Sequence, residues 1–189
     1  FPTRRSSDLE IPGRVENYAN VMADLAREVH SIEVTEEDGF GRAEERQIRR
    51  IDRGLANEDA ALAERCRELI KGLPETNTLI HGDFHTGNVF LQNGEPLLID
   101  MDRVSVGHPI LEISDLLMAY VIRGEDNPSI VSDYMGFPYE TANRFFDFFL
   151  RRYLGTDDEN RLQEVTDKAL ILCAIRVIGK FYEKGTISR

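Results

Sequence analysis

The segment from Thr78 to Asp100 most restricts the folds open to this chain, because it places a short β-hairpin inside a helical sequence. Short apolar pieces alternate with turn residues over this segment, at 78–80, 89–92 and 96–99. Between the last two pieces, Asn93-Gly94 favours a type I′ turn, since both residues tolerate positive φ. The sequence on either side has a helical pattern. We therefore predict an α+β fold that is mainly helical, with a small hairpin as an insert.

Helices are expected before the hairpin. Apolar residues recur at steps of three and four from Val15, and this helix should end near His30. The highly charged stretch 39–53 is predicted to be a solvent-facing helix with few core contacts. Asn57 is expected to cap a further helix, which stops at Gly72.

Three helices are expected after the hairpin. The first covers about 111–121, and Pro138 suits the first turn of the second. The third begins near Asp158 and is about 25 residues long. Because 169–178 is apolar almost all round, we expect the third helix to be the central, buried one.

The charge of the chain argues against two classes of partner. The formal net charge is −11, from 34 Asp and Glu against 23 Lys and Arg. An acidic surface repels phosphate backbones and anionic lipids, so neither nucleic acid nor membrane binding is expected. A cationic or amine-bearing substrate would suit this charge.

The cysteines and the apolar segments indicate the compartment. Cys66 and Cys173 both lie in apolar helical patterns, which predicts buried free thiols in a reducing environment. The sequence has no apolar run of membrane-spanning length and no export signal. We therefore expect a cytoplasmic protein.

The hairpin segment also carries the most unusual polar residues. Asp83 lies in a loop after a strand, Asn88 follows five positions later, and Asp100 ends the hairpin. Phosphoryl transfer from a magnesium nucleotide uses such a set. One carboxylate orients and deprotonates the attacking hydroxyl, while an amide oxygen and a second carboxylate hold the metal. We therefore predict Asp83 as the catalytic base, and Asn88 and Asp100 as ligands of Mg²⁺.

Neighbouring residues are expected to shape this loop or to contact a substrate. The ring of His81 should fix the loop and the turn after the hairpin by hydrogen bonds to the backbone. Gly82 should let the backbone turn tightly. His85 and Asp102 are candidates for contact with phosphate or substrate.

A resemblance to a known family rests on motifs in this segment and just beyond it: His81-Gly82-Asp83, Asn88, Leu98-Ile99-Asp100 and Gly107-x-Pro109. Together they resemble the aminoglycoside phosphotransferase and choline kinase family. The resemblance covers 10–189 and implies the C-terminal lobe of a protein-kinase-like fold. It also implies ATP as phosphoryl donor, Mg²⁺ as metal, and a hydroxyl of a small molecule (an aminoglycoside, choline or an amino sugar) as acceptor.

The chain departs from that family at several points. His108 stands where members usually have Asp, and Glu112-Ile113-Ser114 where they often have Asp-Leu-Ala. No Gly-rich phosphate loop and no Val-Ala-x-Lys strand precede the motif. The resemblance therefore implies that a nucleotide-clamping N-terminal lobe lies upstream, and that the 189 residues alone are inactive. Residues 1–9 have no periodicity and are expected to be a non-native tail.

Two other functions stay open from the sequence. His81, Asp83 and His85 alternate, so a strand would place all three on one face, as a metal-dependent hydrolase requires. The second alternative is that the chain is a truncated, non-catalytic kinase lobe. Three acidic residues could also form a rim around a substrate: Asp102, Glu112 and Asp115.

Overall fold

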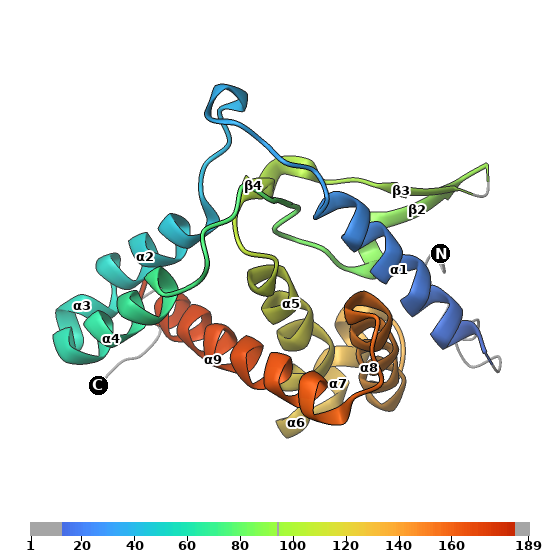
Figure 1. Ribbon diagram of the computed structural model, residues 1–189. Coiled ribbons are helices and arrows are strands. Elements are labelled where there is room, and N and C mark those ends of the chain that lie inside the picture. Colours follow the sequence, from blue (N-terminus) through green and yellow to red (C-terminus); the bar gives the residue numbers. More distant parts are fainter. Residues whose placement is uncertain (1–12, 94, 184–189) are drawn as a thin grey trace.

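The computed structural model describes residues 13–93 and 95–183, and it shows a mainly helical protein with two small antiparallel sheets (Figure 1). This confirms the predicted mainly helical α+β composition. The helices are α1 (Arg14–Val29), α2 (Ala43–Arg53), α3 (Leu55–Glu58), α4 (Ala60–Lys71), α5 (Ile110–Leu117), α6 (Arg123–Asp126), α7 (Pro128–Met135), α8 (Tyr139–Leu154) and α9 (Glu159–Glu183). The strands are β1 (Leu79–Ile80), β2 (Val89–Gln92), β3 (Glu95–Leu98) and β4 (Ser105–Val106).

The helices form two groups that meet at α5 (Figure 1). In the first group, α2 and α5 pack on α9, and α3 and α4 lie beside α2. In the second, α1 packs along α8. A π-helical turn, η5 (Met118–Ile122), continues α5 and contacts α8. There the Tyr120 and Phe145 rings stack with centroids 5.1 Å apart, both fully buried. Burial of side chains this large contributes about 1.5–3 kcal/mol each.

The two sheets flank the polar loop. β1 pairs with β4, with Leu79 opposite Val106. β2 and β3 form the predicted hairpin, with Val89 opposite Leu98. The loop 81–88 leaves β1 and enters β2, so one end of each sheet borders it.

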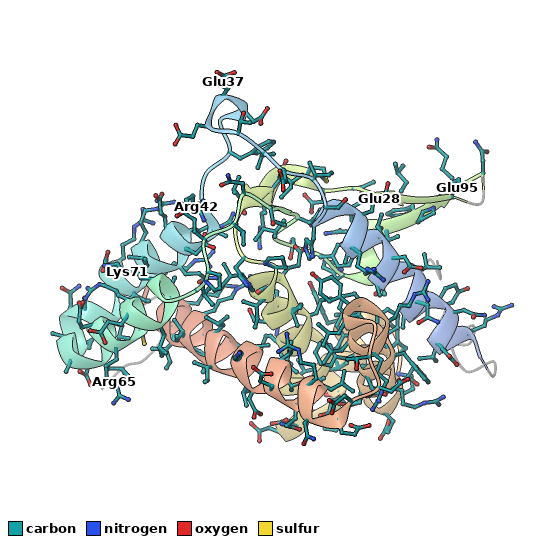
Figure 2. All side chains as sticks on the ribbon, in the orientation of Figure 1. Glu28, Glu37, Arg42, Arg65, Lys71 and Glu95 are labelled. Atoms are coloured by element: carbon teal, nitrogen blue, oxygen red, sulfur yellow. The ribbon has the colours of Figure 1, made fainter. Side chains whose placement is uncertain are left out.

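The turn of the hairpin is described only in part. Asn93 has a φ of 56°, as a type I′ turn requires at its first central position. Gly94 lies outside the described residues. Glu95 stands at the far end of the hairpin, away from the helices (Figure 2).

Most helix ends fall close to the predicted positions, but one cap was assigned wrongly. Asn57 lies inside the short helix α3. Asp59 caps α4 instead, because its extended backbone lets its carboxylate accept a hydrogen bond from the Leu62 N–H at 2.9 Å. Helix α7 was not predicted, although Asn127 followed by Pro128 is a typical start signal.

The charged helix α2 has more core contact than its composition suggested. Ile51 is 1% exposed, and α2 packs on both α4 and α9. Arg46 also extends from α2 to β4, where it donates to the Ser105 hydroxyl at 2.6 Å. The prediction of few core contacts is therefore wrong, because α2 packs on α4 and α9, and Arg46 also extends over β4.

Helix α9 is buried on one side only. Ala169 and Leu172 face the core, whereas Leu170 and Ile171 are 42% and 48% exposed. The prediction of burial all round is wrong, because the other helices cover only one side of α9.

The remaining expectations concern thiols, membrane spans and the N-terminal tail. Cys66 and Cys173 are both free and buried, as predicted. Within the described ranges, no helix combines the length and the apolar character needed to cross a bilayer. The tail predicted at 1–9 lies outside the described residues.

Candidate active site

The loop between β1 and β2 turns sharply at Gly82. Its φ is 79°, and a Cβ there would lie 2.4 Å from the carbonyl oxygen of Arg103. Only glycine meets both demands without strain. Arg46 donates to the same carbonyl at 3.2 Å, so α2 helps to fix this contact. Phe84, 2% exposed, anchors the loop in the core.

His81 joins the loop to the end of the hairpin. Its ring is fully buried, and its Nδ1 accepts a hydrogen bond from the Asp83 N–H at 3.2 Å. The proton of the neutral ring is therefore on Nε2, which donates to the carbonyl of Ile99 at 2.9 Å. One buried ring thus fixes the backbone of Asp83 relative to the residue before Asp100.

Asn88 lies at the base of the hairpin, opposite Ile99, the residue before Asp100. The Ile99 N–H donates to the Asn88 carbonyl at 2.9 Å, one step beyond the last strand pair. The Asn88 amide nitrogen donates to the Asp83 carbonyl at 2.9 Å, so its amide oxygen remains as an acceptor or ligand. Asn88 therefore contacts Asp83 directly, and Asp100 follows the residue that pairs with Asn88.

Asp100 has an unusual backbone conformation. Its φ and ψ are 61° and 58°, in the left-handed region, and its side chain is exposed. A residue other than glycine costs about 1–2 kcal/mol in this region, although Asp tolerates it better than most. Such strain is concentrated at functional positions.

The carboxylate of Asp83 faces a cavity of about 440 Å³. Its side chain is 30% exposed, and its Oδ2 lies 3.7 Å from Arg103 Nη1. The other lining residues come from the loop itself and from α5, η5, α6, α7 and α9. This volume is typical of a site for a small organic molecule.

His85 and Thr86 come next in the loop, and hydrogen bonds fix both of them. Burial lowers the pKa of His85, so the ring is neutral at pH 7. Its Nδ1 accepts from the Gly87 N–H at 3.0 Å, which leaves Nε2–H as a donor. His85 also lines the cavity. Tyr120 fixes Thr86: its hydroxyl accepts from the Thr86 N–H at 2.9 Å, and burial raises the pKa of Tyr120 to about 12.

A buried carboxylate, that of Glu112, accepts a hydrogen bond from the loop backbone. This role was not predicted from the sequence. Glu112, 1% exposed, accepts from the Gly82 N–H at 2.6 Å and from His30 Nε2 at 2.8 Å. His30 Nδ1 accepts in turn from the Tyr153 hydroxyl at 2.8 Å. The network therefore connects α1, α5 and α8 to the loop. A charged residue in the apolar run 110–113 was the signal available in the sequence.

The three acidic residues expected at a substrate rim are separated. Glu112 is buried beneath the loop, so a rim position is wrong for it. Asp115 lines the cavity, where it is paired with Arg176. Asp102 is exposed and does not line this cavity.

A metal-dependent hydrolase site at His81, Asp83 and His85 does not match the structure. These residues lie in an irregular loop rather than in a strand, and backbone groups engage the His81 ring on both nitrogens. Among residues 13–93 and 95–183, no group of three His, Cys, Asp or Glu side chains is placed to hold a metal. This alternative therefore lacks its ligand set.

Comparison with known protein families gives a match over most of the chain. Residues 7–165 match the sequence profile of the phosphotransferase enzyme family. No curated protein matches the chain.

Proposed function

We propose that this chain, which belongs to the phosphotransferase enzyme family, forms the catalytic lobe of an enzyme. That enzyme would transfer a phosphoryl group from ATP to a hydroxyl of a small molecule. The observation that carries this proposal is the loop that fixes Asp83 at a cavity, with Asn88 and Asp100 joined to it through His81 and the hairpin. Positioning of this kind is most of what phosphoryl transfer asks of a protein.

Asp83 would act as the base. The acceptor O–H would donate a hydrogen bond to its carboxylate, which lies 3.7 Å from the Arg103 guanidinium. As the acceptor oxygen forms its bond to the γ-phosphorus, the bond from that phosphorus to ADP breaks. The proton passes to Asp83 and then to water, so the products are a phosphate ester, ADP and a proton.

Asn88 and Asp100 fit Mg²⁺. Asn88 uses its amide nitrogen on the loop backbone and offers its oxygen, and Asp100 offers an exposed carboxylate. These are hard oxygen donors, and Mg²⁺ takes few protein ligands. When bound, the ion would neutralise charge on the nucleotide phosphates.

A second lobe is part of this proposal. The 189 residues contain no Gly-rich phosphate loop and no Val-Ala-x-Lys strand. We place the nucleotide between 10–189, as the C-terminal lobe of a protein-kinase-like fold, and an upstream lobe. The chain alone would then bind ATP weakly and turn over little or none.

The test uses the chain extended by its native upstream sequence, with ADP release measured over a panel of hydroxyl-bearing metabolites. Asp83→Asn should lower kcat by about 10²–10⁴ with unchanged circular dichroism. The matched control is Asp157→Asn, since the Asp157 side chain is 93% exposed and outside the cavity. Equal kcat for Asp83→Asn and wild type would remove Asp83 as the base. No ADP release with any acceptor, together with intact folding, would favour a non-catalytic lobe.

A further inference from the structure

The cavity beside Asp83 carries a surplus of positive charge, in a chain whose net charge is −11. Two carboxylates line it, Asp83 and Asp115. The cationic side chains that line it are Arg103, Arg123, Arg176 and Lys180. The charge at the site is thus opposite to that of the whole protein.

In the part of the chain that the structure describes, only two of the four cationic side chains have a carboxylate partner inside the cavity. Arg103 lies near Asp83, and Arg176 contacts Asp115. Among the side chains that the structure describes, no carboxylate pairs with Arg123 or Lys180. The Arg123 guanidinium instead lies 5.4 Å from the centre of the Tyr134 ring.

The environment of these cations is unfavourable without a counter-charge. Burial, and the positive charges of Arg176, Arg50, Arg103 and Arg123, lower the pKa of Lys180 to about 8. Burial likewise lowers the pKa of Arg176 to about 10, and its Nε is buried without a partner. Buried polar groups are normally paired, and clustered like charges cost stability. An anion in the cavity would remove both costs.

The position of the cations separates them from the proposed metal site. Arg123 comes from α6 and Lys180 from α9, whereas Asn88 and Asp100 do not line the cavity. An anion held by the two cations would therefore lie on the acceptor side of Asp83, away from the nucleotide phosphates.

We propose that the acceptor is an anionic hydroxyl compound, and that Arg123 and Lys180 bind its carboxylate or phosphate group. The inference rests on the proposed phosphoryl transfer and adds the charge class of the acceptor to it. The amine-bearing acceptors that net charge and family resemblance suggested would meet repulsion here. In the reaction the anionic group is unchanged, and only the acceptor O–H is converted to a phosphate ester.

The test is isothermal titration calorimetry of the full chain, at low salt and without ATP. The ligands are inorganic phosphate and three sugars that differ in charge. Glucuronate and inorganic phosphate should bind, while glucose should bind more weakly and glucosamine weakest. Lys180→Gln and Arg123→Gln should each weaken anion binding roughly tenfold or more, because each removes a charge-assisted hydrogen bond. Arg123→Lys should restore part of the affinity, which separates lost charge from misfolding.

Lys168→Gln is the matched control, because Lys168 lies on the same helix and is 59% exposed, outside the cavity. It should leave anion binding unchanged. No saturable binding of either anion, or glucosamine binding as tightly as glucuronate, would overturn the inference. So would a tenfold loss of ATP binding in Lys180→Gln, measured in a separate titration with ATP, if glucuronate binding is unaffected, because the cations would then serve the nucleotide.

Failure of this inference can be told apart from failure of the proposed function. Asp83→Asn should keep anion binding, since Asp83 adds no positive charge to the site. Phosphoryl transfer is measured separately, by ADP release. Transfer to a neutral or amine acceptor would therefore refute the anionic acceptor and leave the proposed function in place.

Discussion

Replacing Glu112 by Ala should destabilise the whole protein without removing any side chain that lines the cavity. Its carboxylate is 1% exposed and accepts from the Gly82 N–H at 2.6 Å and from His30 Nε2 at 2.8 Å. A third contact, to the His81 N–H, is long at 3.4 Å and contributes little. Truncation therefore leaves two buried donors without acceptors.

The expected cost follows from those two donors. Each buried group left unpaired costs about 1–3 kcal/mol, and breaking a buried pair typically costs about 3–5 kcal/mol in total. We expect about 3–5 kcal/mol for Glu112→Ala, against a total stability of about 5–15 kcal/mol for a domain. The corresponding fall in Tm is roughly 6–20 °C.

Glu112→Gln should cost less, about 1–2 kcal/mol. The amide oxygen can still accept from the Gly82 N–H. The amide nitrogen can donate to His30 Nε2 if the proton of that ring moves to Nδ1, which then donates to the Tyr153 hydroxyl oxygen. The isosteric variant therefore separates loss of the acceptor from loss of volume.

Urea unfolding followed by circular dichroism and tyrosine fluorescence measures these differences, since the chain has six Tyr and no Trp. Glu37→Ala is the control, because Glu37 lies at the exposed tip of η2 (Glu36–Asp38), far from the loop (Figure 2). A Glu112→Ala protein within about 0.5 kcal/mol of wild type would refute the view that this carboxylate supports the loop.

Two further measurements address the hairpin end and the cavity. Asp100→Ala should be less stable than Asp100→Gly by about 1–2 kcal/mol in urea unfolding, because only glycine adopts a φ of 61° without strain; equal stabilities would mean that this conformation is not kept in solution. The pKa of Lys180 is lowered to about 8 from 10.5. Between these two pH values the unfolded chain therefore binds more protons at this group than the folded chain does. The contribution of Lys180 to the free energy of unfolding should rise with pH through that window. Over the same rise Lys180 loses its charge, so glucuronate affinity should fall above about pH 8. A Lys180→Gln protein should lack that fall, and an equal pH dependence in both proteins would exclude Lys180 as its source.

The features predicted well from the sequence are local ones. The hairpin was predicted because Asn93-Gly94 fixes a tight turn between short strands, and turn geometry sets the register of such a pair. Once that register holds, Asn88 lies opposite Ile99, and Asp100 follows directly. Spacing along the chain was therefore enough to predict that Asn88 and the end of β3 lie on opposite sides of the hairpin base.

Two of the errors concern features that depend on distant residues. The exposure of Leu170 on α9 depends on which helices pack against it, and an apolar run does not say how many neighbours it has. The role of Glu112 depends on a donor thirty positions away in the loop and on a histidine from α1. No periodic pattern contains that information.

The sequence by itself determined the family, the mainly helical composition and the order of the polar residues in the hairpin segment. Only the tertiary structure decided the charge of the cavity. Net charge pointed toward a cationic acceptor, yet α6 and α9 place Arg123 and Lys180 beside Asp83. The reason is physical: at short range in a partly buried site, a few oriented charges outweigh a screened surface charge that is spread over the whole molecule.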